Sequence, residues 1–165
     1  MRITFIQTGG TIDKDYPRTT KGYAFEISGP AVKRIMEKVN PAFEYEIIPL
    51  LQKDSLDITD EDRIKILEAC KAASGDKIVI THGTDTMIET AKVLSVITNK
   101  TIVITGAMRP EKFSDSDAMF NVGAAITATE IVPNGIYIAM HGMVYKWDEV
   151  KRDMENGQFI GQGLN

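Results

Sequence analysis

Two short segments of the sequence combine glycine with hydroxyl and carboxyl groups that could attack a carbonyl. In the first, TGGTI, two glycines separate Thr8 from Thr11. In the second, HGTDTM, Thr84 and Asp85 follow His82 and a glycine. Glycine lets the backbone approach a ligand closely, and threonine and aspartate supply compact hydrogen-bonding groups. A threonine in a tight turn could act as a nucleophile while backbone N–H groups stabilise the oxyanion.

Other interpretations of these segments stay open on the residues alone. The glycines of TGGTI could serve only a structural turn, and nucleotide binding has weak support because the segment matches neither Walker A nor G-x-G-x-x-G. A threonine nucleophile needs a base, yet a histidine directly after a strand, as expected for His82 and His141, is more often a structural group. The sequence contains no G-x-S-x-G, H-x-E or H-E-x-x-H, so serine-hydrolase and zinc chemistry are not indicated. A cation near Lys151 or Arg152 is the remaining candidate for the base.

Short runs rich in β-branched residues predict the strands that would position these segments. The runs lie at 2–7, 44–50, 77–81, 101–105 and 135–140. Helical spacing recurs between them and predicts an apolar face in each of four helices. The faces are Val32, Ile35, Met36 and Val39; Ile64, Leu67 and Cys70; Met87, Ala91 and Leu94; and Met119, Val122 and Ile126. Thr59, followed by acidic residues, predicts a helix N-terminus. Because the runs are continuously apolar, we expect a doubly wound α/β three-layer sandwich with a mostly parallel five-stranded sheet, in a flavodoxin-like or Rossmann-like order.

The expected topology gathers the chemistry at one edge of the sheet. Ligands of open parallel sheets bind outside the carboxyl ends of the strands, where the winding reverses. In a flavodoxin-like order the strands at 2–7 and 77–81 are neighbours, so Thr11 and Thr84 would face the same crevice.

Composition limits the classes of function. The chain has 165 residues, of which 43% are hydrophobic and 25% charged, and we expect one domain over 1–165. The net charge of −4 without a basic run argues against a nucleic-acid or anionic-membrane partner. The sequence shows no signal peptide and no long apolar run, which predicts a cytoplasmic protein. We expect Cys70 to be a buried, unpaired thiol and the segment NGQFIGQGLN to be a polar tail.

Four segments resemble the bacterial L-asparaginase (asparaginase/glutaminase) family, in the order TGGTI, ITHGTDTMIETA, TGAMRP and SDAMFN. The paired T-G-G-T and H-G-T-D-T motifs are highly specific at this separation. The match covers almost the whole chain but only the N-terminal domain of the family, so we expect the family's C-terminal domain to be absent. The resemblance implies a threonine amidohydrolase that releases ammonia from asparagine, or less readily glutamine, without a metal or cofactor. It also implies a homo-oligomer that acts on a small amide or amino acid. The alternative is a domain that binds such a ligand without turnover or that depends on a partner chain.

The resemblance also implies roles for the first loop. Thr11 would be the acylated nucleophile. Tyr23, in KGYAF, would be the tyrosine of a mobile loop that closes over the substrate.

A second set of catalytic residues comes from the later loops. Thr84 and Asp85 would act with a cation, in a Thr-Asp-Lys arrangement, and Asp85 would also hold the substrate ammonium. The best alignment of DEVKRD places Arg152 at the lysine position with Lys151 beside it. Arginine stays protonated and cannot serve as a base, so the two residues imply different chemistry.

The resemblance implies substrate-binding residues in each loop as well. These are Gly10, Ser55, Gly83 and Ala107. Ser55 would contact the substrate carboxylate, and the backbone of Ala107 would contact the amide. Leu56 stands where the family usually has a polar residue that binds substrate.

Overall fold

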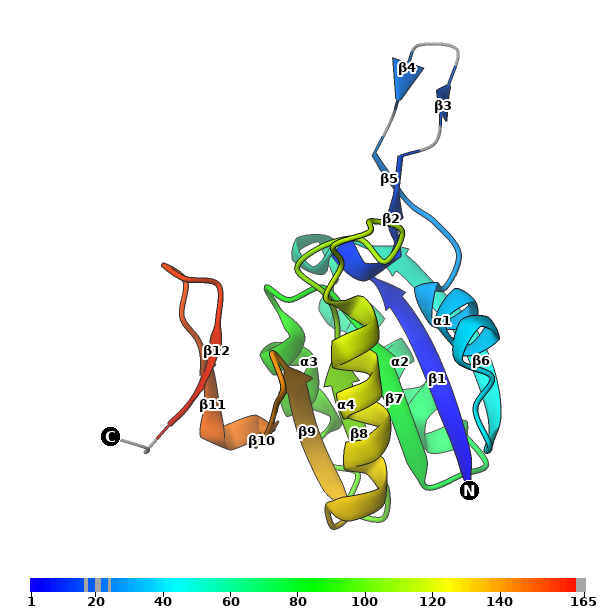
Figure 1. Ribbon diagram of the computed structural model, residues 1–165. Helices are drawn as coiled ribbons and strands as arrows, with labels where there is room; N and C mark the ends of the chain where they lie inside the picture. The colour runs from blue at the N-terminus through cyan, green and yellow to red at the C-terminus, as the bar shows by residue number, and fades with distance from the viewer. Residues whose placement is uncertain (17, 20–21, 24, 163–165) are drawn as a thin grey trace.

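A six-stranded sheet forms the middle of the computed structural model, in the order β10-β9-β8-β7-β1-β6 (Figure 1). The structure describes residues 1–16, 18–19, 22–23 and 25–162, without the side chains of 17–24. The strands are β1 (Arg2–Gly9), β6 (Glu44–Lys53), β7 (Lys77–Thr81), β8 (Thr101–Thr105), β9 (Gly135–Met140) and β10 (Met143–Lys146). Each neighbouring pair is parallel except β9 with β10. The expected α/β class with a mostly parallel sheet is confirmed.

The order of the strands decides between the two expected topologies. In chain order the five parallel strands lie 2-1-3-4-5 across the sheet, which is the flavodoxin-like arrangement. The sixth strand, β10, was not expected from the sequence. It follows a tight turn in which His141 and Gly142 have φ of 55° and 81°, as in a type I′ hairpin. The His-Gly pair is not among the usual sequence signals for that turn, which explains the omission.

Helices cover both faces of the sheet (Figure 1). α1 (Ala31–Val39) and α4 (Ala118–Ile131) lie on one face, and α2 (Asp60–Ala72) and α3 (Met87–Leu94) on the other. Phe5 and Val79 pair in register and pack in the first of these layers, whereas Ile6 and Ile80, one residue further on, pack in the second. This alternation gives each face of the sheet its own apolar core.

The start of α2 follows the sequence signal. The Thr59 hydroxyl accepts a hydrogen bond from the backbone N–H of Asp62, and the Asp62 carboxylate accepts one from the N–H of Thr59. This capping box confirms the predicted N-terminus. Further along, Cys70 is buried and unpaired as expected, and burial raises the pKa of its thiol to about 12. Ile64, expected on the same face, is 52% exposed, and Ile66 takes the inward position instead.

Short hairpins and 3-10 turns extend from the sheet. Beyond β1 the chain forms β2 (Lys14–Asp15), β3 (Arg18–Thr19), β4 (Gly22–Tyr23) and β5 (Glu26–Ile27), and after β10 it forms β11 (Val150–Arg152) and β12 (Phe159–Gly161). The 3-10 turns are η1 (Thr11–Asp13), η2 (Ser55–Asp57) and η3 (Trp147–Glu149). The expected polar tail is therefore partly a strand, and Phe159 is buried in the core of the α2–α3 face.

None of the helices in the described part of the chain is both long and apolar enough to span a membrane.

Candidate active site

Glycines bring three loops together at the carboxyl ends of β1, β6 and β7. A Cβ on Gly10 would lie 2.4 Å from both Cα and N of Gly83, and a Cβ on Gly83 would lie 2.6 Å from Cβ of Ser55. Real Cβ atoms cannot approach so closely, so both positions require glycine. Gly10 also has a φ of 83°, in the left-handed region, and its N–H donates to the carbonyl of Lys53 at 2.9 Å. The three expected substrate-binding residues Gly10, Ser55 and Gly83 are thus in direct contact.

The two threonines of TGGTI occupy different environments. Thr8 is buried in β1, and its hydroxyl donates to the carbonyl of Thr81 at 2.8 Å, which ties β1 to β7. Thr11 begins η1 and is half-buried, as is Thr84 in the adjoining turn after β7. Among the side chains that the structure describes, none forms a hydrogen bond to the hydroxyl of Thr11 or of Thr84. The structure therefore gives Thr8 a structural contact and leaves Thr11 and Thr84 beside the contact between Gly10 and Gly83.

Asp85 is the centre of a polar cluster beside Thr84. The buried Ser55 hydroxyl donates to Oδ2 of Asp85 at 3.3 Å and accepts from the Asp85 backbone N–H, also at 3.3 Å. Nη1 of Arg152 forms an ion pair with Oδ1 of the same carboxylate. The Arg152 side chain is 14% exposed, whereas Lys151 is exposed and forms no ion pair with Asp85. The structure thus brings Arg152, and not Lys151, to Asp85.

The β11–β12 hairpin holds Arg152 in this position. Arg152 pairs with Phe159 across the hairpin, and the Asp153 N–H donates to the carbonyl of Gln158 at 2.7 Å. The Tyr145 hydroxyl, from β10, donates to the carbonyl of Phe159 at 3.2 Å. The prediction of a polar tail missed this role, because the segment is polar and rich in glycine. Among its described residues only Phe159 is buried.

His82 is a structural group. Its Nδ1 lies 2.7 Å from the carbonyl of Gly83, which can only accept, so this nitrogen carries the proton. Nε2 then accepts a hydrogen bond from the Thr90 hydroxyl at 2.8 Å. Burial lowers the pKa of His82 to about 4, so the ring is neutral at neutral pH. The structural interpretation of this histidine is confirmed.

The loop after β8 is fixed by two residues of the segment SDAMFN. The Asp117 carboxylate accepts from the N–H groups of Met108 and Arg109 at 3.0 Å each, which holds the buried Ala107 between β8 and that turn. The Asn121 side chain donates to the carbonyl of Gly106 at 3.0 Å. The segment SDAMFN contributes to the family resemblance, but no role was predicted for Asp117 or Asn121.

The base of the β2–β5 hairpin borders the same edge of the sheet. Nζ of Lys14 lies 2.6 Å from the Asp54 carboxylate and 5.2 Å from the centre of the Phe25 ring. The hydrogen bond from Lys14 lowers the pKa of Asp54 below its usual range. A cavity of about 570 Å³ lies between the hairpin and the end of β6. Tyr23 pairs with Arg18 through its backbone in β3–β4, and its side chain lies outside the described residues.

Within the described ranges, no group of three or more His, Cys, Asp or Glu residues could hold a metal ion.

Residues 2–155 match the family model described as "Asparaginase, N-terminal". The chain belongs to the asparaginase family. It is 28% identical to a glutaminase-asparaginase of Acinetobacter glutaminasificans over 97% of this chain and 53% of that protein. It is 35% identical to a component of the glutamyl-tRNA(Gln) amidotransferase of Methanococcus maripaludis over 85% of this chain and 35% of that protein.

Solved structures of the asparaginase family have the same fold. The thermostable L-asparaginase from Thermococcus kodakarensis superposes with a TM-score of 0.82 at 29% identity, covering 98% of this chain and 51% of that one. The chain thus spans about half the length of the asparaginase relatives it matches. The flavodoxin-like sheet is this chain's version of the N-terminal part of the family fold.

Proposed function

We propose that the chain is an asparaginase-like amidohydrolase that releases ammonia from a small amide, with L-asparagine as the first candidate substrate and Thr11 as the nucleophile. The observation that carries the proposal is the contact between Gly10 and Gly83, which sets the turn of Thr11 against the turn of Thr84 and Asp85. Membership of the asparaginase family, and relatives named L-asparaginase and glutaminase-asparaginase, support the reaction class.

The reaction would proceed through an ester. The Thr11 hydroxyl attacks the amide carbon, its proton passes through the Thr84 hydroxyl to the departing nitrogen, and ammonia leaves. Water then hydrolyses the Thr11 ester and releases the acid. Arg152 stays protonated, so its role is to hold the Asp85 carboxylate rather than to accept a proton. Tyr23, from the hairpin, would close over the bound substrate.

Substrate binding follows from the polar cluster. A carboxylate offers about four lone-pair sites, and Asp85 uses one for Ser55 and one for Arg152, so it could still accept from a substrate ammonium. The Ser55 hydroxyl would turn from Asp85 toward the substrate carboxylate on binding. The backbone at Ala107, fixed by Asp117, would contact the amide.

The ion pair of Arg152 favours a second candidate, binding of a small amino acid or amide without turnover. A cation that cannot lose its proton gives the site no base of the kind that lysine would supply. A chain that needs a partner chain for turnover would also bind without turnover when it is assayed alone. A partner chain is considered because one relative is a component of an amidotransferase. The predicted homo-oligomer and cytoplasmic location stay predictions from the sequence.

Ammonia release from asparagine, glutamine and simple amides tests the proposal. Wild type should release ammonia from one of them, and Thr11→Ala and Thr84→Ala should lower the rate by roughly a thousandfold or more. Thr98→Ala is the control, because Thr98 is exposed in the loop that precedes β8, at the opposite edge of the sheet, and this variant should match wild type. If wild type binds an amide but releases no more ammonia than Thr11→Ala, the chain is a binding module.

A further inference from the structure

The outer face of α4 is apolar, unlike that of α1 on the same side of the sheet. α1 exposes Lys33, Glu37 and Lys38 to solvent. α4 has a single charged residue, Glu130, and its carboxylate already forms an ion pair with Lys77. A helix that is apolar on all sides is usually covered on all sides. In Figure 1, α4 lies in front of the sheet, and none of the described elements covers its outer side.

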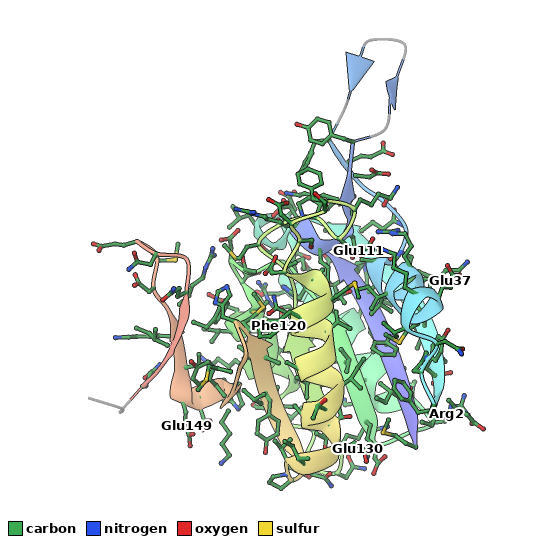
Figure 2. The ribbon with its side chains drawn as sticks, viewed as in Figure 1. Arg2, Glu37, Glu111, Phe120, Glu130 and Glu149 are labelled. Atoms are coloured by element: carbon green, nitrogen blue, oxygen red, sulfur yellow. The ribbon has the colours of Figure 1, made fainter. Side chains whose placement is uncertain are left out.

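Large apolar side chains lie exposed at both ends of this face. Phe120 is 63% exposed and Ile131 is 74% exposed. Met119 is exposed as well, although helical spacing predicts it on the inward face with Val122. Figure 2 shows Phe120 near one end of α4 and Glu130 near the other. The exposed apolar surface therefore extends along the whole helix.

A groove of about 510 Å³ runs along α4 beside β10. Between the two large side chains it is lined by Gly123, Ala124 and Thr127, with Val144 on the side of β10. A Cβ on Gly123 would meet nothing within 4 Å, so the groove is open at this place. The distance between two packed helices depends on the side chains at their contact, and small residues allow a close approach.

The pattern of residues along this face is the same from either end. Phe120, Ala124, Thr127 and Ile131 follow one another at intervals of four, three and four residues, which places them in one stripe along the helix. The stripe reads large, small, small, large. An interface between two identical copies related by a twofold axis must be complementary to itself. Two antiparallel copies of α4 meet this condition, because Phe120 then lies opposite Ile131 and Ala124 opposite Thr127.

We propose that a second copy of this chain binds to the outer face of α4, in an antiparallel twofold pair of helices in which Phe120 of each copy packs against Ile131 of the other. Neither residue belongs to the candidate active site, so the pairing is independent of the proposed function.

The size and charge of the face fit such a dimer. A stable interface buries about 800 Å² on each partner, of which about 450 Å² is apolar. With about 200 Å² for a fully exposed large side chain, Met119, Phe120 and Ile131 supply on the order of 350 Å². The lining of the groove adds to this area. Charges on a twofold face can meet their own copies and repel each other, so a face without an unpaired charge favours a second copy.

Sedimentation velocity over a range of concentrations tests the pairing. Wild type should change from one to two chains per particle as the concentration rises. Ile131→Glu and Phe120→Glu should each raise the dissociation constant at least about tenfold, because the twofold axis places each carboxylate in the apolar interface twice. Val96→Glu is the matched control and should keep the wild-type constant, because Val96 is 65% exposed and follows α3, on the other side of the sheet.

Disulfide trapping tests the antiparallel arrangement without a charge in the interface. Helices that pack through small residues lie about 8 Å apart, close enough for a disulfide between facing positions. An equal mixture of Ala124→Cys and Thr127→Cys proteins should form the mixed disulfide in excess of its statistical share, as measured by intact mass spectrometry. Cys70 is buried, and burial raises the pKa of its thiol to about 12, so it should not compete.

Circular dichroism should give the same helix content for wild type and for each glutamate variant, so that a change in assembly is separated from a loss of fold. Wild type that stays a single chain at every concentration overturns the proposal and assigns the face to a different partner. A dimer that both glutamate variants leave unchanged also overturns it. A mixed disulfide at or below its statistical share contradicts the antiparallel arrangement.

Discussion

The ion pair between Arg152 and Asp85 determines the charge of the candidate site. Arg152 reaches the carboxylate from the β11–β12 hairpin, and the Ser55 hydroxyl donates to the other oxygen. A guanidinium keeps its charge at any pH of interest, whereas an ammonium that is partly buried can lose its proton. The site thus holds a fixed cation where the family resemblance implies a lysine.

Replacing Arg152 tests that difference. Arg152→Lys keeps a cation within reach of Asp85 and adds a group that can titrate, so kcat for ammonia release should rise toward alkaline pH. Arg152→Met leaves Asp85 without its partner and should lower kcat/KM by at least tenfold, about 1.4 kcal/mol. Lys151→Met is the matched control, because Lys151 is exposed. A rate that responds to Lys151 and ignores Arg152 would contradict the assignment.

The loops meet through glycine, and this packing makes the site sensitive to one methyl group. A Cβ at Gly83 would lie 2.6 Å from Cβ and 2.7 Å from Oγ of Ser55, so the loop after β6 would have to move. Gly83→Ala should therefore lower the free energy of unfolding by about 1–3 kcal/mol and reduce ammonia release at least tenfold. Calorimetry and the ammonia assay measure the two effects.

Gly123→Ala is the matched control for Gly83. Gly123 lies inside α4, and a Cβ there would meet nothing within 4 Å. Alanine favours a helix interior over glycine by up to about 1 kcal/mol, so this variant should be as stable as wild type or more stable, with unchanged activity. A Gly83→Ala protein that behaves like Gly123→Ala would show that the loop contact is not needed.

The five parallel strands of the sheet were predictable because each contains a run of apolar, β-branched residues. The β1 run at 2–7 and the β7 run at 77–81 lie at the predicted positions, and Thr59 caps α2 as its sequence signal indicates. The contacts that complete the site were not predictable. β10 depends on an unusual His-Gly turn, and the hairpin of Arg152 packs into the core through Val150 and Phe159. Hydrophobic periodicity predicts which face of a helix or strand is buried, but it does not predict which segments distant in the sequence pack together.

Two buried groups give the whole molecule an unusual dependence on pH. His82 has its pKa lowered to about 4 by burial, so the unfolded state binds a proton more readily than the native state below about pH 6.5. Acidification therefore removes stability through His82. Asp13 has its pKa raised to about 7, so the native state binds the extra proton, and acidification adds stability. From pH 6.5 to about pH 5 the two effects oppose each other.

This opposition predicts a difference between wild type and Asp13→Asn. Wild type should keep a nearly constant free energy of unfolding from pH 6.5 to about pH 5. Asp13→Asn retains only the effect of His82 and should lose roughly 1.4 kcal/mol per pH unit over the same range. Urea unfolding at several pH values measures both curves. Parallel curves would contradict the assignment of a proton to Asp13.

The chain spans about half the length of its asparaginase relatives, so the central question is whether its own crevice carries out the chemistry. Trapping the ester intermediate answers it most directly. After acid quench during turnover of asparagine or another accepted amide, peptide mass spectrometry should find the acyl group on the peptide of Thr11, and Thr11→Ala should carry none. Ammonia release without an acyl group on Thr11, or with one on Thr84, would contradict the account.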